Sequence, residues 1–144
     1  QEIYYLAQEV SRLFALRKKH EEYLQKIMVS YCPNLVGLAG VTIAAGLIQI
    51  AKGLKRLALL PASTVQILGA EKALFRHINT GAKSPKHGLI LQHPLLQHSK
   101  RSDRGKMARA LADKLSLCAR LDYFKGEFKA EEYRQELERK HERD

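Results

Sequence analysis

The chain has 144 residues and a formal net charge of +10, which suits one domain, with or without an appendage, that buries a hydrophobic core. The positive charge is uneven: residues 52–109 hold twelve Lys and Arg against only Glu71 and Asp103. This concentration excludes a general solubility device as its explanation and indicates a binding surface, first for nucleic acid and second for an anionic membrane.

The two cysteines and the N-terminus bear on the compartment. Cys32 and Cys118 are far apart in apolar, helical contexts, so we expect free buried thiols rather than a disulfide. Residues 1–6 lack the basic segment and apolar run of a signal peptide. Because the chain starts at a Gln within a helical pattern, we expect it to be a fragment of a longer protein.

Residues 3–31 are predicted to form one helix with a heptad seam. The seam consists of Ile3, Leu6, Val10, Leu13, Arg17, His20, Leu24, Ile27 and Tyr31. One interpretation is a helix packed on its own domain. The other, which the narrow seam favours, is one arm of a coiled coil whose partner helix is not in this chain. We therefore divide the chain into a partial coiled-coil helix, 1–33, and a domain, 34–144.

The next segment is strongly apolar. Pro33 is placed to begin a helix, and residues 35–51 are apolar nearly all round. This run is slightly shorter than the ~20 residues of a membrane span, and its small residues suit close packing, so we predict one buried core helix. Gly53 ends that helix, and residues 54–60 are predicted to form a short basic one.

A helix is predicted after Gly69, with good helix formers from Glu71 to Arg76. Lys72 and Arg76 are four residues apart and share one face, where a bound anion would relieve their repulsion. We expect Leu74 and Phe75 to point into the core. Glu71 is expected to pair with Lys72 or to cap this helix.

The chain then becomes an irregular basic loop. Asn79, Gly81, Pro85 and Gly88 interrupt regular structure here. The loop also carries three groups that can be cationic, namely Lys83, Lys86 and His87. A basic helix that leads into such a loop is suited to binding a phosphate backbone.

The C-terminal half completes an all-α prediction. Residues 89–91 are apolar and possibly strand-like, Pro94 begins a small helix, and 99–103 is a polar loop. A long helix is predicted over 104–123, and a charge-alternating helix over 130–143. The long helix is expected to bury Met107, Leu111, Leu115, Cys118 and Ala119, and to expose Lys106, Arg109, Asp113 and Arg120.

Enzyme and metal interpretations are weaker than RNA binding. His77, His87, His93 and His98 match no zinc spacing. Residues 81–84 resemble the end of a Walker loop only faintly, since a preceding strand and a following helix are lacking. No acids are paired as in a catalytic pocket. We therefore predict no enzyme, no metal and no cofactor.

The remaining candidate site is basic. A solvated basic face is the plain alternative, but twelve basic against two acidic residues favours binding. The predicted RNA-binding residues are Lys72, Arg76, Lys83, Lys86, His87, Arg104, Lys106 and Arg109. Because we expect few exposed aromatic residues for stacking, binding to naked RNA should be weak and salt-sensitive.

Residues 34–138 closely resemble the Nop domain of box C/D small ribonucleoprotein scaffold proteins. The resemblance is carried by ASTVQILGAEKALFRH at 62–77, PKHG at 85–88 and RGKMARALADK at 104–114. The PKHG and HP pieces look most like the archaeal form. By this resemblance, residues 69–76 form the helix that approaches the RNA, and Lys86 and His87 lie on a loop that reaches RNA beyond the kink. The contact with a kink-turn-binding protein would involve Gly69, Ala70, Glu71 and Ala73.

The resemblance also implies a function. Members of the family are non-catalytic scaffolds that bind a kink-turn guide RNA jointly with a kink-turn-binding ribosomal-type protein. They recruit the methyltransferase fibrillarin through a separate N-terminal domain, which we do not find in this chain, and self-associate through their coiled coil. Localisation would be cytoplasmic for an archaeal-type protein and nucleolar for a eukaryotic one. Two alternatives stay open: a spliceosomal factor with the same domain, and a purely protein-binding helical module.

Overall fold

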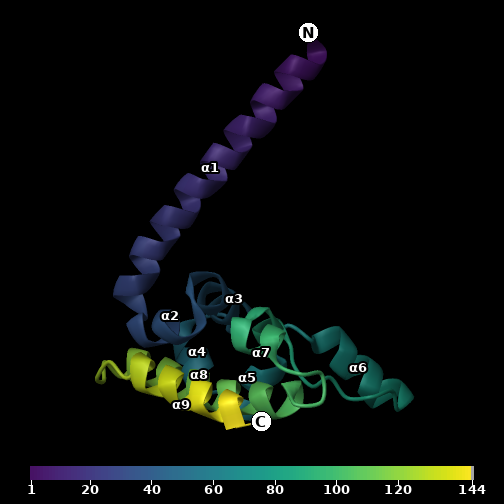
Figure 1. Cartoon of the computed structure of the whole chain (residues 1–144), viewed down its shortest axis with the longest axis vertical. Helices are drawn as coiled ribbons and strands as arrows, with labels where there is room; N and C mark the ends of the chain where they lie inside the picture. The colour runs from purple at the N-terminus through teal and green to yellow at the C-terminus, as the bar shows by residue number, and fades with distance from the viewer. Residues whose placement is uncertain (144) are drawn as a thin grey trace.

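The computed structural model describes residues 1–143, and every regular element in that range is helical, which confirms the all-α prediction. The N-terminal elements are α1 (Glu2–Tyr31), α2 (Pro33–Ala39), α3 (Val41–Ala51), α4 (Leu54–Leu59) and α5 (Ala62–Ile67). They are followed by α6 (Glu71–Thr80), the 3-10 helix η1 (Leu89–Gln92), α7 (Pro94–His98), α8 (Arg104–Tyr123) and α9 (Ala130–Arg143). Figure 1 shows a long arm, α1, standing on a body formed by the other helices.

The core is built around α8, against which α2, α4, α5 and α9 pack. As predicted, Leu111, Leu115 and Cys118 are buried on one face of α8, while Lys106 and Arg109 are exposed on the other. Burial of each such leucine contributes roughly 1.5–3 kcal/mol to the stability of the body. The charged helix α9 packs against both α2 and α8 and buries Ala130 and Leu137.

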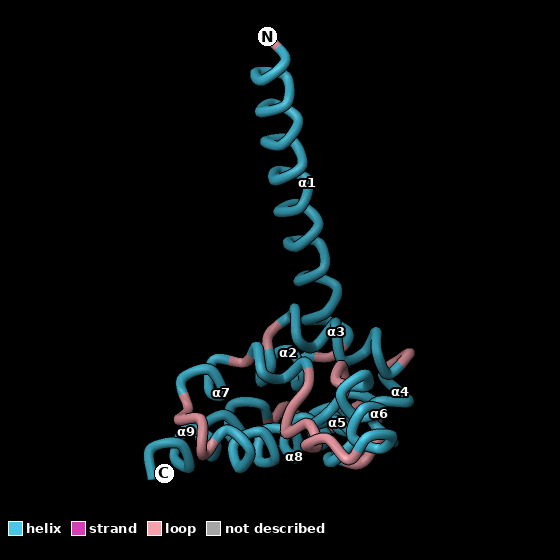
Figure 2. The backbone as a smooth tube through the Cα atoms, turned by 90° about the vertical axis from the view of Figure 1, so that its right-hand side faces the viewer, coloured by secondary structure: helices cyan, strands magenta, loops and turns pink. Residues whose placement is uncertain are grey.

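The arm α1 stands away from the body in both views (Figure 1, Figure 2). Met28 is its one buried residue among those described. The apolar seam is exposed over most of its length, with Ile3 at 84% and Leu13 at 63% exposure. The single long helix is as predicted, whereas its assignment as one arm of a coiled coil stays a prediction.

The predicted single helix over 35–51 is wrong, because the chain bends at Gly40. α2 and α3 meet there at 120°, and Gly40 adopts φ 82, in the left-handed region where glycine is favoured. No single described helix is long and apolar enough to cross a membrane, although the bent pair of α2 and α3 meets those criteria by length and composition. Both helices bury apolar side chains in the protein core, including Leu35, Leu38 and Leu47.

Residues 89–91 are not a strand but belong to η1. The N–H of Leu89 donates to the carbonyl of Leu68 at 2.7 Å, and the N–H of Leu91 donates to Gly88 at 3.2 Å. Ile90 is fully buried. The apolar character of residues 89–91 is therefore explained by the burial of Ile90 in the core rather than by pairing in a sheet.

Both cysteines are free and buried, as predicted. Burial, assisted by the nearby charge of Asp122, raises the pKa of each thiol to about 12. The thiols are therefore protonated at neutral pH and act as small apolar core groups.

Candidate nucleic-acid interface

The basic loop at 81–88 is tied to α5 at its C-terminal end. The side-chain amide of Gln66 donates to the carbonyl of Lys86 at 2.6 Å, and the N–H of Gly88 donates back to the carbonyl of Gln66 at 2.9 Å. A Cβ at Gly88 would lie 2.0 Å from the carbonyl oxygen of Leu68, so only glycine fits there. The backbone that carries Lys86 and His87 is therefore fixed by contacts with α5 and with the residue that follows it, Leu68.

This loop meets the turn between α7 and α8 and forms an open hollow of about 600 Å³. The hollow is lined by Lys83, Lys86, His87, Arg101 and Arg104. Four of these five residues carry a full positive charge at neutral pH, and no acidic residue lines the hollow. A concave surface with one sign of charge concentrates its field and attracts anions.

The cations differ in how they are held. The Arg104 guanidinium donates to the carbonyls of Ser99, at 3.3 Å, and of Gln97, at 3.5 Å. Among the described residues, the charged groups of Lys83, Lys86 and Arg101 have no hydrogen-bond or ion-pair partner. These three charges are therefore available to a bound anion.

The helix α6 lies at the edge of the body (Figure 1) and buries none of its residues. Lys72 and Arg76 are exposed, as expected from their shared face. The prediction that Phe75 points into the core is wrong: it is 64% exposed, and Ile78 is 67% exposed. Leu74 is half-buried. The other helices do not cover the side of α6 that carries Phe75 and Ile78, so the exposed surface of this helix is both apolar and basic.

The N-terminal turn of α6 is held by its own residues. A Glu71 carboxylate oxygen accepts the N–H of Gly69 at 2.8 Å, which fixes the turn before α6. Neither role expected for Glu71 is seen: Gly69 lies outside the helix, so this bond is not a cap, and no ion pair joins Glu71 to Lys72 among the described residues. Gly69 adopts φ 90, and Ala70 precedes the first helical residue. Gly69, Ala70, Glu71 and Ala73 thus lie together at one end of α6, apart from the residues that line the hollow.

Comparison with known proteins identifies the family. The family model for Nop, whose description reads "snoRNA binding domain, fibrillarin", matches residues 1–143. The chain belongs to the Nop family. An uncharacterised NOP5 family protein of Methanocaldococcus jannaschii is 49% identical over 134 residues, which cover 93% of this chain and 32% of that protein. Nucleolar protein 58 of Schizosaccharomyces pombe is 45% identical over 117 residues, covering 81% of this chain and 23% of that protein.

A solved structure has the same fold. The chain in the crystal structure of a fibrillarin/Nop5p complex is matched with a TM-score of 0.76 and 34% identity. The match covers 95% of this Nop chain and 51% of the solved chain. This chain therefore spans about a third or less of the curated relatives named above, and half of the solved one.

The hollow of this Nop domain gathers only part of the predicted site. It contains Lys83, Lys86, His87 and Arg104, whereas Lys72 and Arg76 on α6, and Lys106 and Arg109 on α8, lie outside its lining. Arg101 was not among the predicted residues. The only signal for Arg101 in the sequence was that it follows Lys100, which makes a basic pair in the 99–103 loop. A loop has no periodicity from which the direction of a side chain can be inferred.

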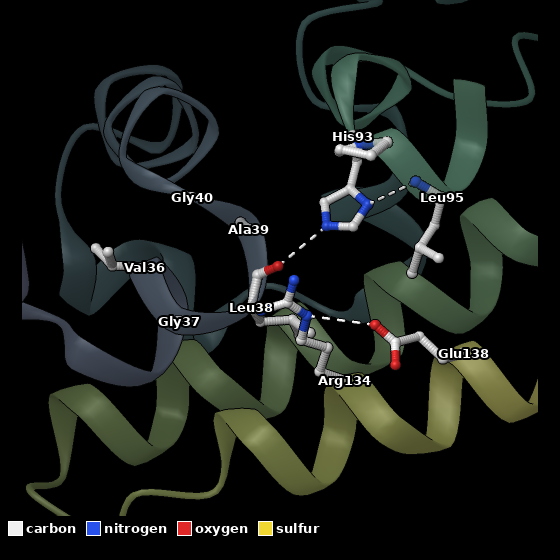
Figure 3. A pocket seen from close by; sticks show the side chains of 10 residues that line it. Val36, Gly37, Leu38, Ala39, Gly40, His93, Leu95, Arg134 and Glu138 are labelled. Carbon is white, nitrogen blue, oxygen red and sulfur yellow. Dashed lines mark hydrogen bonds and ion pairs between the residues drawn. The ribbon is translucent and has the colours of Figure 1, made fainter. Parts of the chain in front are cut away.

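Three of the four candidate histidines form hydrogen bonds within the protein, whereas His87 lines the hollow. In Figure 3, His93 bridges two helices: its Nε2 is 3.0 Å from the carbonyl of Leu38, and its Nδ1 accepts the N–H of Leu95 at 3.2 Å. His77 bonds the carbonyl of Ala82, and His98 bonds that of Pro94 at 2.7 Å. In residues 1–143, no three potential ligands among His, Cys, Asp and Glu come together to hold a metal ion.

Proposed function

We propose that this chain is the RNA-binding scaffold portion of a box C/D small ribonucleoprotein protein. It recognises a kink-turn guide RNA jointly with a kink-turn-binding protein and supports assembly of the 2′-O-methylation complex. The scaffold role is one of binding and positioning, without catalysis by this chain. Family membership supports this proposal, together with the names of its nucleolar and NOP5 relatives.

The observation that carries the proposal is the basic hollow. Its charges come from two segments separated by η1 and α7, namely 83–87 and 101–104, and no acidic residue lines it. RNA helices are recognised mainly through shape and phosphate contacts, and a preformed cationic hollow beside an exposed basic helix suits that recognition. The predicted RNA-binding residues are retained in this proposal, both those in the hollow and those on α6 and α8.

The exposed outer surface of α6 supports joint recognition with a protein. Phe75 and Ile78 provide apolar area, and Lys72 and Arg76 provide charge on the same exposed side. A solvent-exposed Phe next to Arg is the composition enriched at protein interfaces, and its ring could equally stack on a base. The N-terminal turn of α6, with Gly69, Ala70, Glu71 and Ala73, is assigned to the kink-turn-binding protein.

Two further partners belong to this proposal, namely fibrillarin and a second copy of the chain. The solved structure contains fibrillarin, and we assign fibrillarin recruitment to a part of the whole protein outside these 144 residues. We assign self-association to α1, whose exposed seam needs an apolar partner. The eukaryotic relatives are named as nucleolar proteins. We therefore propose that a eukaryotic protein containing this domain is nucleolar, and that an archaeal one is cytoplasmic.

The test is a gel-shift titration of a kink-turn RNA with this chain, with and without the kink-turn-binding protein at saturation. We expect weak, salt-sensitive binding alone and tight binding in the presence of that protein. A duplex RNA of equal length without a kink serves as the control. Equal affinity for all RNAs, with or without the protein, would contradict joint recognition.

A further inference from the structure

Arg101 is located where it can act on the same anion as the 81–88 loop. It lies in the turn between α7 and α8, which is closed by the N–H groups of Asp103 and Arg104 donating to the carbonyl of Lys100 at 2.9 and 3.1 Å. The same hollow is lined by Lys86 from the other segment. The turn therefore holds the Arg101 backbone in a defined position at the edge of that hollow.

Lys86 is directed toward α8 rather than away from it. A Cβ built at Gly105 would lie 3.7 Å from Cδ of Lys86, so the lysine stem lies over the first turn of α8. Its backbone is held by Gln66, as described above. Lys86 thus reaches from the 81–88 loop to the end of α8 that directly follows the Arg101 turn.

The charges in this hollow are not compensated by the protein. Lys83, Lys86 and Arg101 have no hydrogen-bond or ion-pair partner in the described part of the chain, and Arg104 donates only to neutral carbonyls. Like charges held together raise the free energy of the unbound state, and an anion placed among them relieves that repulsion. A phosphate offers acceptor oxygens to several donors at once.

We propose that Lys86 and Arg101 bind the same backbone phosphate of the RNA, so that the hollow is one phosphate-binding site built from two segments. This inference rests on the proposed function. It adds Arg101 as a contact residue and separates the hollow from α6, whose Lys72 and Arg76 bind elsewhere on the RNA. Recognition in the hollow is by charge and shape, and is therefore independent of base identity.

The experiment is a double-mutant cycle on the whole 144-residue chain. A labelled box C/D kink-turn RNA is titrated, with the kink-turn-binding protein saturating, against Lys86→Ala, Arg101→Ala and the double variant. A second cycle pairs Arg101→Ala with Arg76→Ala on α6. Lys55→Ala, which removes an exposed charge on α4 outside the hollow, is the matched control. Circular dichroism checks that each variant is folded.

We expect the Lys86/Arg101 double variant to flatten the slope of log K against log salt by about one contact in all, each single substitution to flatten it by no more than that, and Lys55→Ala to leave it unchanged. The loss in the Lys86/Arg101 double variant should fall short of the product of the single losses by about twofold or more, because the two side chains share one phosphate. The Arg76/Arg101 losses should multiply.

Two results would overturn the inference alone: RNA binding unaffected by Arg101→Ala, or Lys86 and Arg101 losses that multiply fully. Absence of any binding of the unsubstituted chain would overturn the proposed function as well, and so would equal binding to the unkinked control. The two failures are therefore distinguishable in one set of titrations.

Discussion

The side chains of Asn34 and Asp122 join the start of α2 to the end of α8, with the Asn34 amide nitrogen donating to Oδ1 of Asp122 at 2.9 Å. The carboxylate also accepts the backbone N–H of Asn34 at 3.0 Å and that of Leu35 at 2.8 Å. Asp122, on α8, thus caps the start of α2 in place of a residue in α2's own sequence. Asn34 in turn accepts the N–H of Lys129 at 2.7 Å, which joins the segment before α9 to the same network.

Asp122→Ala should destabilise the domain by about 2–4 kcal/mol, because the start of α2 loses its cap and the Asn34 amide loses a charged acceptor in a buried setting. Urea unfolding followed by circular dichroism measures the change. Asp113→Ala, at an exposed position of the same helix, should change stability by less than about 0.5 kcal/mol. Equal effects at the two positions would show that the network contributes nothing.

Stability should fall below neutral pH because of His93. Its two ring nitrogens donate to Leu38 and accept from Leu95, which requires the neutral ring. Burial lowers the pKa of His93; the hydrogen bond to the Leu38 carbonyl opposes this shift and the charge of Arg134 reinforces it. The unfolded chain, with an ordinary pKa near ~6.5, then binds the proton first. This contribution is full above that pH and is lost as the pH falls toward and through the lowered value.

Thermal unfolding from pH 7.5 to 5.5 tests this dependence. We expect Tm to decrease over that interval in the unsubstituted chain. His93→Gln should be less stable at pH 7.5 and should show a smaller decrease. His98→Gln, at an exposed position on α7, should keep the full pH dependence. An unchanged pH profile for His93→Gln would contradict the assignment.

Substitutions on α6 should separate charge from apolar contact. Lys72→Ala and Arg76→Ala should each weaken the ternary complex on every kink-turn RNA and flatten the salt slope by about one contact. Phe75→Ala should weaken the complex by about 1–3 kcal/mol, leave the salt slope unchanged, and hardly affect folding, since the ring is exposed. A large loss of folding stability in Phe75→Ala would restore the original expectation that this residue belongs to the core.

His87 tests the direction of the 81–88 loop. If the loop reaches RNA beyond the kink, His87→Ala should cost about 1–3 kcal/mol on RNAs that carry the far stem and little on shortened ones. The measurement is a titration of both RNAs with the kink-turn-binding protein saturating. An equal loss on the shortened RNA would place the contact nearer the kink.

The exposed seam of α1 should drive self-association. Leu6→Glu combined with Leu13→Glu should weaken dimerisation by at least about tenfold, because each buried leucine contributes roughly 1.5–3 kcal/mol. Gln8→Glu adds a charge away from the seam and should leave association unchanged. Sedimentation equilibrium of the three chains provides the comparison. A strictly monomeric unsubstituted chain at high concentration, with α1 helical, would contradict this expectation.

The sequence by itself determined the helical class, the long first and eighth helices and the buried face of α8. Those features repeat every three to four residues over many turns, so local periodicity is enough to reveal them. The sequence also indicated the basic segment, because an excess of Lys and Arg can be counted without knowing the structure.

Only the tertiary structure decided the bend at Gly40, the exposure of Phe75 and the place of Arg101. The apolar run continues through Gly40, so the hydrophobic pattern of this segment does not indicate the bend. Phe75 is exposed because neighbouring helices leave α6 at an edge, which depends on the packing of the whole body. Arg101 meets Lys86 in one hollow, although fourteen residues separate them, because the contact with Gln66 and the turn after α7 bring two loops together. The meeting of these two loops depends on long-range contacts, which the periodicity of the sequence does not reveal.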